Sequence, residues 1–289
     1  MNYRHAFHAG NFADVVKHVV LTRILLYLQE KPAPFRFIDT HAGAGLYDLT
    51  STEALRGGEW QDGIGRLLRA ELSPDAASLS KPYLDIVRAF NPSGEPRAYP
   101  GSPLIARALL RPQDRLVACE LEPLARRQLV DCLRRDRQAR VVELDGWTAL
   151  PAFVPPNERR GLVLIDPAFE AANEFATLAG RFAAAFAKWP SGSYMLWYPV
   201  KDLRTTRTFG ADIARAVAAG KPATSRHDDS CLRVEFSVAP PGGGDATLRA
   251  AGLLIVNPPW TLAGELGKVL PALAAILGRT TGSFSLDCP

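Results

Sequence analysis

An acidic residue and two glycines follow the first strongly apolar run of the chain and suit nucleotide binding. Residues 39–45 read Asp-Thr-His-Ala-Gly-Ala-Gly, directly after the mainly apolar run 35–38. Gly43 and Gly45 let the backbone turn sharply and approach a ligand, while Asp39 can accept hydrogen bonds. The segment predicts a strand ending in a nucleotide loop with Gly43 as a contact, although a tight turn without a ligand has the same pattern.

Two further acidic positions stand at the ends of the next predicted strands. A nicotinamide fingerprint needs a third glycine where this chain has Asp48. Glu120 can instead accept hydrogen bonds from both ribose hydroxyls of an adenosyl group. Asp145 and Gly146 hold a position that commonly contacts the adenine in methyltransferases. Each acid alone can be a solvated strand end, but ligands of open α/β sheets bind outside these ends, so the series predicts a cofactor site.

The fourth apolar run leads into a loop that can bind an amino group. Residues 166–169 read Asp-Pro-Ala-Phe and resemble the D-P-P-Y/F signature of amino-group methyltransferases. The Asp166 carboxylate and the Pro167 carbonyl can orient a weakly nucleophilic purine amine, and the carboxylate can accept a proton. Phe169 can stack on an unstacked base. These three residues are the catalytic candidates, and Ala168 departs from the signature.

The elements that must position these residues alternate along the chain. Predicted strands span residues 35–39, 115–120, 139–144, 162–166, 194–198, 232–239 and 251–257. Predicted helices span residues 12–30, capped by Asn11, and 124–133, 175–188, 203–219 and 262–277. Five parallel strands closed by an antiparallel hairpin resemble the class I S-adenosylmethionine-dependent methyltransferases. We therefore expect a Rossmann-like α/β fold with a seven-stranded mixed sheet.

Residues 40–45 are called the glycine loop below. The long segment between this loop and the second predicted strand predicts an insertion. We expect a methyltransferase domain at residues 1–46 and 99–289, and a small helical subdomain at residues 47–98. Two helical patterns lie near residues 61–71 and 83–90, with prolines, Pro82 among them, as punctuation. The subdomain can grip a large substrate or only stabilise the fold, and the pattern favours neither.

Composition narrows the classes of protein. The 289 residues are 47% apolar and 22% charged, and neither a secretory signal nor a continuous membrane-spanning apolar run is present, so we expect a cytoplasmic globular protein. Four scattered cysteines indicate free thiols, and the histidines match no zinc spacing, so we expect no metal. The net charge of +4 permits a polyanionic partner. Arginine pairs such as Arg134 with Arg135 can bind phosphate, although solvated surfaces have the same pattern.

Two other segments have competing interpretations. Lys17 or His18 can pair with the methionine carboxylate of the cofactor, or lie on the solvated face of the first helix.

Residues 257–260 read Asn-Pro-Pro-Trp and fit a second catalytic pattern. Because they follow the seventh strand, which we expect at the sheet edge, we interpret them as a turn.

Six segments together resemble the RlmJ family, whose members methylate an adenine N6 in 23S ribosomal RNA. They are residues 3–11, 13–18, 39–45, 99–103, 196–199 and 257–260. The resemblance implies S-adenosylmethionine contacts at His18, His41, Ser102, Glu120, Asp145, Gly146 and Asp166, with Lys17 adjacent. It also implies Asp166 as proton acceptor and Tyr3 as a substrate contact, with Arg4 and His5 as further candidates.

The resemblance implies 23S ribosomal RNA as the partner, and we expect a monomer. Two alternatives fit the same residues. One is a DNA adenine-N6 methyltransferase, because the chemistry is identical. The other is a nucleic-acid-binding protein for DNA utilisation that has lost activity through Ala168.

Overall fold

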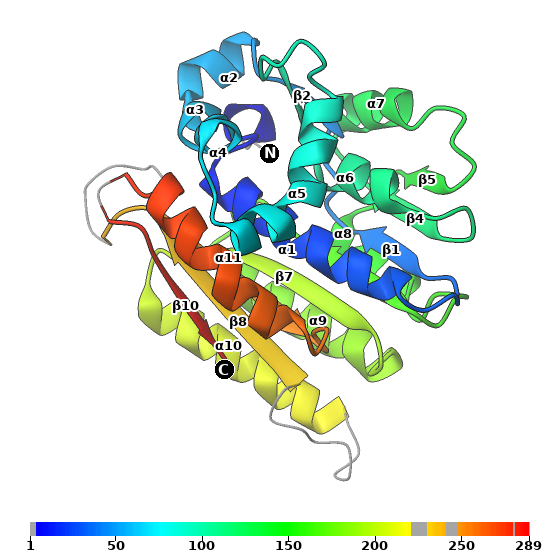
Figure 1. Cartoon of the computed structure of the whole chain (residues 1–289). Helices are drawn as coiled ribbons and strands as arrows, with labels where there is room; N and C mark the ends of the chain where they lie inside the picture. Colours follow the sequence, from blue (N-terminus) through cyan, green and yellow to red (C-terminus); the bar gives the residue numbers. More distant parts are fainter. Residues whose placement is uncertain (1–3, 221–229, 241–247, 280, 289) are drawn as a thin grey trace.

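A mixed eight-stranded sheet forms the centre of the molecule (Figure 1). The computed structural model describes residues 4–220, 230–240, 248–279 and 281–288. The strands are β1 (Arg36–Asp39), β4 (Arg115–Cys119), β5 (Ala139–Val142), β6 (Gly161–Ile165), β7 (Ser193–Pro199), β8 (Cys231–Ser237), β9 (Ala250–Val256) and β10 (Ser283–Asp287). Their order across the sheet is β10-β8-β9-β7-β6-β1-β4-β5.

Five neighbouring strands run parallel and place their carboxyl ends along one edge. β1 pairs in parallel with β4 and β6, and β5 and β7 extend the ladder on either side. β9 is antiparallel to both β7 and β8. The prediction of five parallel strands closed by an antiparallel hairpin is confirmed.

The predicted count of seven strands was one too low. β10 pairs antiparallel with β8 at the sheet edge, and the Arg233 guanidinium holds its end through two hydrogen bonds to Asp287. Its sequence alternates serine with single apolar residues, and Phe284 is partly exposed. A short edge strand with one solvated face has no apolar run to reveal it.

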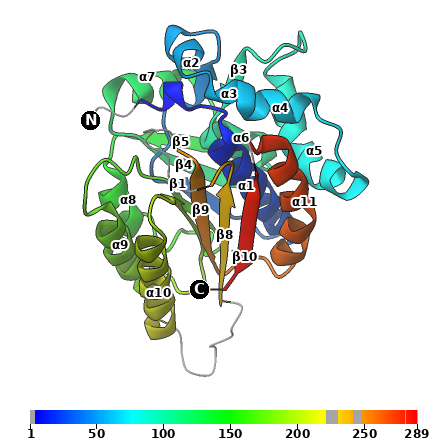
Figure 2. The same cartoon turned by 90° about the vertical axis from the view of Figure 1, so that its left-hand side faces the viewer.

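Helices cover both faces of the sheet (Figures 1 and 2). On one face lie α1 (Phe12–Gln29), α6 (Ser102–Leu109) and α11 (Leu262–Leu277). On the other lie α8 (Gly146–Ala152), α9 (Glu174–Lys188) and α10 (Leu203–Gly220). The Asn11 side chain caps α1 by accepting from the Asp14 backbone N–H, as predicted. In the described ranges, no helix has the length and apolar composition needed to span a bilayer.

The insertion is more helical than its sequence pattern predicted. Between β2 (Leu46–Asp48) and β3 (Ala98–Pro100), which pair antiparallel, lie α2 (Thr52–Gly57), α3 (Glu59–Asp62), α4 (Ile64–Arg69) and α5 (Pro74–Ala89). Pro82 lies inside α5 and does not end it, which corrects the predicted break. The buried residues Ala76, Tyr83 and Val87 continue one packing face across the proline, so burial outweighs the lost hydrogen bond. The division into two domains stays a prediction.

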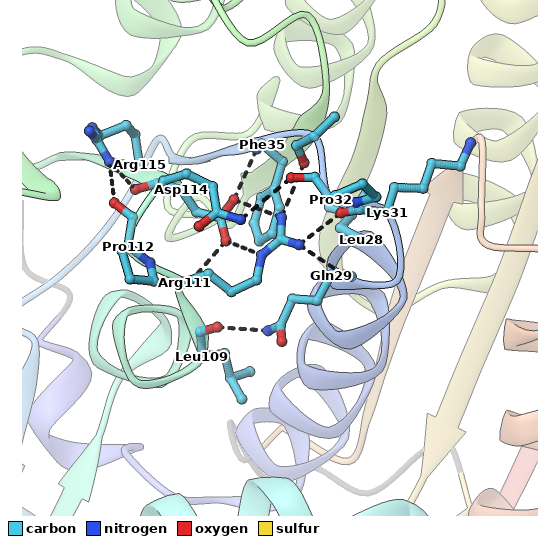
Figure 3. A network of polar contacts seen from close by, with 12 residues as sticks. Leu28, Gln29, Lys31, Pro32, Phe35, Leu109, Arg111, Pro112, Asp114 and Arg115 are labelled. Atoms are coloured by element: carbon cyan, nitrogen blue, oxygen red, sulfur yellow. Dashed lines mark hydrogen bonds and ion pairs between the residues drawn. The ribbon is translucent and has the colours of Figure 1, made fainter.

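An ion pair with a buried carboxylate and a partly exposed guanidinium fastens the amino-terminal ends of two central strands (Figure 3). The Asp114 side chain, fully buried, accepts hydrogen bonds from the Arg111 guanidinium and from the backbone N–H of Arg111 and Phe35. The same guanidinium donates to the carbonyls of Gln29, Lys31 and Ala33. This pair therefore joins the end of α1 to the starts of β1 and β4, and fixes the strands that carry the glycine loop.

Candidate active site

Residues from four strand ends meet around one cavity at the carboxyl edge of the sheet. Its volume is about 210 Å³. The lining includes His41 after β1, Glu120 after β4, Asp145 and Gly146 after β5, and Pro167 and Ala168 after β6. The parallel order of these strands brings together positions up to 127 residues apart, from His41 to Ala168.

The glycine loop is tied to the acid at the end of β4. The Gly43 backbone N–H donates to Glu120 Oε2 at 2.8 Å, and the Glu122 N–H donates to Oε1 at 2.7 Å. Gly43 has φ of +64°, and a Cβ there would lie 2.2 Å from the Tyr47 hydroxyl oxygen. A side chain at this position is therefore excluded by both backbone and space. The two bonds fix the Glu120 carboxylate, whose remaining lone pairs can accept ligand hydroxyls.

The opposite wall of the cavity depends on a second glycine. A Cβ on Gly146 would lie 2.5 Å from the His41 imidazole and from the Thr40 carbonyl oxygen. Asp145 caps α8 by accepting from the Thr148 N–H at 3.0 Å. The His41 ring meets Trp147 edge to face, with centroids 5.0 Å apart, and burial lowers the His41 pKa to about 4. A neutral imidazole and an indole therefore flank the place where a planar ring can enter.

We expect Gly146→Ala to weaken S-adenosylmethionine binding at least tenfold. The new methyl group would collide with the His41 ring and with backbone, so the cavity wall would have to shift. Isothermal titration of the cofactor measures the change. Gly180→Ala on α9 is the matched control, because its Cβ would meet nothing within 4 Å. Equal affinity of both variants would contradict this view of the cavity wall.

A buried lysine connects the first helix to the β6 loop. The Lys17 ammonium lies 2.8 Å from Asp14 Oδ1 and donates to Asp166 Oδ2 at 2.5 Å. Asp14 also accepts from the Gly10 backbone N–H and contacts the His5 ring nitrogen at 3.0 Å. Burial opposes the charge on both groups, but the two carboxylates raise the Lys17 pKa overall, and the Lys17 ammonium holds the Asp14 pKa well below its usual range. Lys17 is therefore a permanent cation that fixes one oxygen of Asp166.

His18 and Ser102 lie beneath the strand ends and do not line the cavity. The His18 Nδ1 is 2.7 Å from the Tyr99 hydroxyl, its Nε2 is buried without a hydrogen-bond partner, and burial lowers its pKa to about 3. Ser102 donates to Asp39 Oδ2 at 2.6 Å. Lys17 and His18 are only 4% and 1% exposed, so the alternative that they lie on a solvated helix face is wrong.

Asp39 gives the site a measurable pH dependence. Burial raises its pKa to about 7, although the Ser102 hydrogen bond opposes the shift. Since this is above the unfolded value of about 4, the native state holds the proton more tightly, and stability falls as pH rises from about 4 to 7. We expect the difference in unfolding free energy between Asp39→Asn and the native sequence to increase over this range and level off above it. Urea unfolding at a series of pH values measures it; a constant difference would contradict a raised pKa.

The aromatic residue of the β6 loop has an unusual backbone. Phe169 has φ of +52°, which is rare for a bulky residue and marks a position held by its surroundings. Its ring packs against Phe175, at 4.8 Å between centroids, and meets Trp197 edge to face at 5.8 Å. Phe169 is only partly buried, so part of its ring is available to a ligand.

The three amino-terminal residues predicted to contact the substrate differ in their surroundings. Tyr3 lies outside the described residues. Arg4 is exposed and lies 3.6 Å from Glu53 at α2, whereas His5 contacts Asp14 and so joins the Lys17 cluster. Sequence reasoning missed Asp14 and Trp147, although Asp14 stands three residues before Lys17, a spacing that places both on one helix face.

The Asn-Pro-Pro-Trp segment lies away from this site, as expected, but the predicted position of its strand at the sheet edge was wrong. β9 is an interior strand between β7 and β8, not an edge strand. Because β9 runs antiparallel to β7, Asn257 lies beside the start of β7, where its amide donates to the carbonyls of Pro190 and Gly192. The segment therefore closes a turn at the amino-terminal edge of the parallel strands.

No group of three or more metal-ligating side chains occurs within the described part of the chain. The residues do fit S-adenosylmethionine. The two glycines leave the space that side chains would fill, and Glu120 and Asp145 border a cavity beside the β6 loop. A parallel sheet with this set of strand ends defines a class I S-adenosylmethionine-dependent methyltransferase.

Comparisons with known proteins specify the family. Residues 32–288 match the model described as "Ribosomal RNA large subunit methyltransferase D, RlmJ", and the chain belongs to this family. It is 40% identical to the ribosomal RNA large subunit methyltransferase J of Escherichia coli, with 94% of this chain and 92% of the relative covered. Identity to the protein of the same name from Haemophilus influenzae is 36%, with 99% and 98% covered.

A solved structure has the same overall fold. Protein LPL1258 of Legionella pneumophila matches with a TM-score of 0.85 and 32% identity, covering 97% of this chain and 98% of that one. The expected RlmJ membership, enzyme class and α/β methyltransferase fold are confirmed, and the chain is a ribosomal RNA methyltransferase that uses S-adenosylmethionine.

Proposed function

We propose that this chain transfers a methyl group from S-adenosylmethionine to the N6 amino group of an adenine in 23S ribosomal RNA. The observation that carries the proposal is the Asp166 loop beside the cofactor cavity, with Pro167 and Ala168 in the cavity wall. The relatives are named for ribosomal RNA of the large subunit, which supports this substrate.

The proposed cofactor residues divide by the part of the ligand they suit. Glu120 would accept the ribose hydroxyls, while Asp145, Gly146 and His41 would border the adenine. Gly43, His18, Ser102 and Lys17 would shape the amino-acid end from below. The bound cofactor supplies an activated methyl group on a sulfonium, so neither a metal nor a covalent enzyme nucleophile is required.

The proposed catalytic residues act on the target amine. Lys17 holds Asp166 Oδ2, and the other carboxylate oxygen can accept an N6–H, with the Pro167 carbonyl accepting the second. This geometry directs the nitrogen lone pair toward the methyl group, and Asp166 takes up the proton released on transfer. Phe169 would stack on the flipped or unpaired base. Tyr3, Arg4 and His5 are proposed to contact the target nucleotide.

The departure at Ala168 leaves the proposed contacts in place. The position contributes backbone and a methyl group to the cavity wall, and the flanking Asp166, Pro167 and Phe169 retain the groups that the chemistry uses. A loss of proline changes loop rigidity and adds one backbone N–H. We therefore expect the reaction to survive.

Methyl transfer to isolated nucleic acids tests the proposal. Labelled S-adenosylmethionine is supplied with protein-free 23S ribosomal RNA or with adenine-containing DNA of matched length, and the products are digested to nucleosides. We expect N6-methyladenosine from the RNA and little product from the DNA. N6-methyldeoxyadenosine as the main product would favour the DNA enzyme, because the 2′-hydroxyl distinguishes the two target nucleotides. Cofactor binding without transfer to either would favour a binding protein.

A further inference from the structure

A second concave site lies beside the end of α7 (Pro123–Cys132) and is separate from the cofactor cavity. It is a shallow depression, open to solvent, of about 390 Å³. Its lining is dominated by guanidinium groups from α6 and from the loop between α7 and β5: Arg107, Arg134, Arg135 and Arg137, together with Asp136 and Gln138. We call this set the arginine pocket.

The arginine pocket is strongly basic. Its lining contains four arginines and one aspartate, a net charge of +3. Asp136 is already paired with Arg107. Arg134, Arg135 and Arg137 are exposed and form no ion pair with any described residue. Three guanidinium groups thus remain available to an anion at one place.

The backbone also holds one of these arginines in an unfavourable conformation. Arg135 has φ of +65°, a region in which glycine or asparagine is usual. Its backbone position gives no reason for an arginine, since glycine would adopt it without strain. The side chain, which lines the pocket, is the feature that an anion-binding role explains.

The pocket is connected to the cofactor loop through α7. Cys132, which also lines the pocket, places its sulfur 3.9 Å from the Ala44 carbonyl oxygen of the glycine loop. A Cβ on Gly45 would meet Leu129 at 2.9 Å and Cys132 at 3.6 Å. The three exposed arginines follow the end of α7. They lie at the amino-terminal edge of the parallel strands, where the Gln138 side chain in the pocket wall donates to the carbonyls of Arg111 and Asp114. The catalytic loop follows the carboxyl ends of the same strands, so only a ligand as long as a polymer could contact both.

We propose that the arginine pocket binds backbone phosphates of the RNA substrate outside the target nucleotide. This rests on the proposed function, since it takes ribosomal RNA as the polyanion. Guanidinium groups form paired hydrogen bonds with phosphate oxygens, and such contacts position a nucleic acid without reading its sequence. The pocket would hold the strand while the target adenine enters the catalytic loop. Free inorganic phosphate has the same chemistry and is tested separately.

The test compares charge removal inside and outside the pocket. The pocket variant is Arg134→Ala, Arg135→Ala and Arg137→Ala together. The control removes three exposed arginines from α9 and α10, Arg181→Ala, Arg204→Ala and Arg207→Ala, on the other face of the sheet (Figure 2). A third variant replaces the pocket arginines with lysine. Filter binding of 23S ribosomal RNA at several salt concentrations and steady-state methylation are measured for each.

We expect the pocket variant to bind RNA at least tenfold more weakly and to raise KM for RNA, with kcat and cofactor affinity unchanged. Each lost phosphate contact should reduce the salt dependence of log K by about 0.7 to 0.9. The lysine variant should recover a large part of the binding. Weakening of the control to the same extent would overturn the proposal, because net charge alone would explain the loss.

Two further outcomes are distinct. Specific competition by millimolar inorganic phosphate at constant ionic strength, with RNA affinity unaffected by the pocket variant, would identify a free-phosphate site and overturn RNA binding there. A native protein that binds RNA through the pocket but makes no N6-methyladenosine would contradict the proposed function and not the pocket. The binding assay therefore tests the arginine pocket, and the product assay tests the proposed function, each without the other.

Discussion

Replacement of Asp166 by asparagine is expected to lower methyl transfer at least 100-fold. The substitution retains size and one carbonyl oxygen but removes the group that takes up the proton from the target amine. Positioned general bases typically contribute factors of about 10² to 10⁴. It also removes one of the two carboxylates that balance the buried Lys17 ammonium. Single-turnover transfer from labelled cofactor to saturating RNA measures the chemical step directly.

The control for Asp166→Asn must separate chemistry from folding. Asp212→Asn on α10 removes one carboxylate from a solvated ion pair and should retain native turnover. Asp166→Asn should retain cofactor binding within a few fold, since Gly43, Glu120 and Gly146 are unaltered. Turnover within threefold of the native protein would reject Asp166 as the proton acceptor. Loss of cofactor binding together with turnover would assign Asp166 to cofactor binding instead.

The strand ends could be predicted because each carries a local signal. An apolar run such as residues 162–165 followed by an acid predicts a buried strand and its functional end, and the sheet edge then brings Glu120, Asp145 and Asp166 together. The sequence of β10 contains no such apolar run, so this strand was not predicted. Pro82 wrongly predicted the end of a helix, because the sequence shows that a proline lacks an N–H but does not show the packing that compensates for it.

The contacts of Lys17 could not be predicted from spacing. Its partner Asp166 is 149 positions away, and only the fold brings the two together. The sequence pattern allowed a methionine carboxylate or solvent beside the lysine, whereas the structure places two carboxylates of the protein there. The lysine therefore orients the catalytic loop in addition to any role toward the cofactor.

The Arg111–Asp114 pair holds the starts of β1 and β4, two of the strands whose opposite ends form the site. Asp114 satisfies two backbone N–H groups and two guanidinium N–H groups in a fully buried position, and Arg111 also covers the Phe35 ring at 5.7 Å. Removal of the buried carboxylate leaves two backbone N–H groups and part of the guanidinium without an acceptor, although Arg111 keeps its three carbonyl acceptors. Such changes typically cost about 3 to 5 kcal/mol. That is a large part of the stability of an ordinary domain.

We therefore expect Asp114→Ala to lower the free energy of unfolding by about 3 kcal/mol or more. Urea unfolding followed by tryptophan fluorescence measures it, and Asp212→Ala is the control, because its exposed pair with Arg215 should contribute less than about 1 kcal/mol. If Asp114→Ala cannot be purified in folded form, Asp114→Asn retains an acceptor oxygen and should show a smaller loss. A loss below about 1 kcal/mol in Asp114→Ala would mean that water replaces the carboxylate, and that the starts of β1 and β4 are held by packing alone.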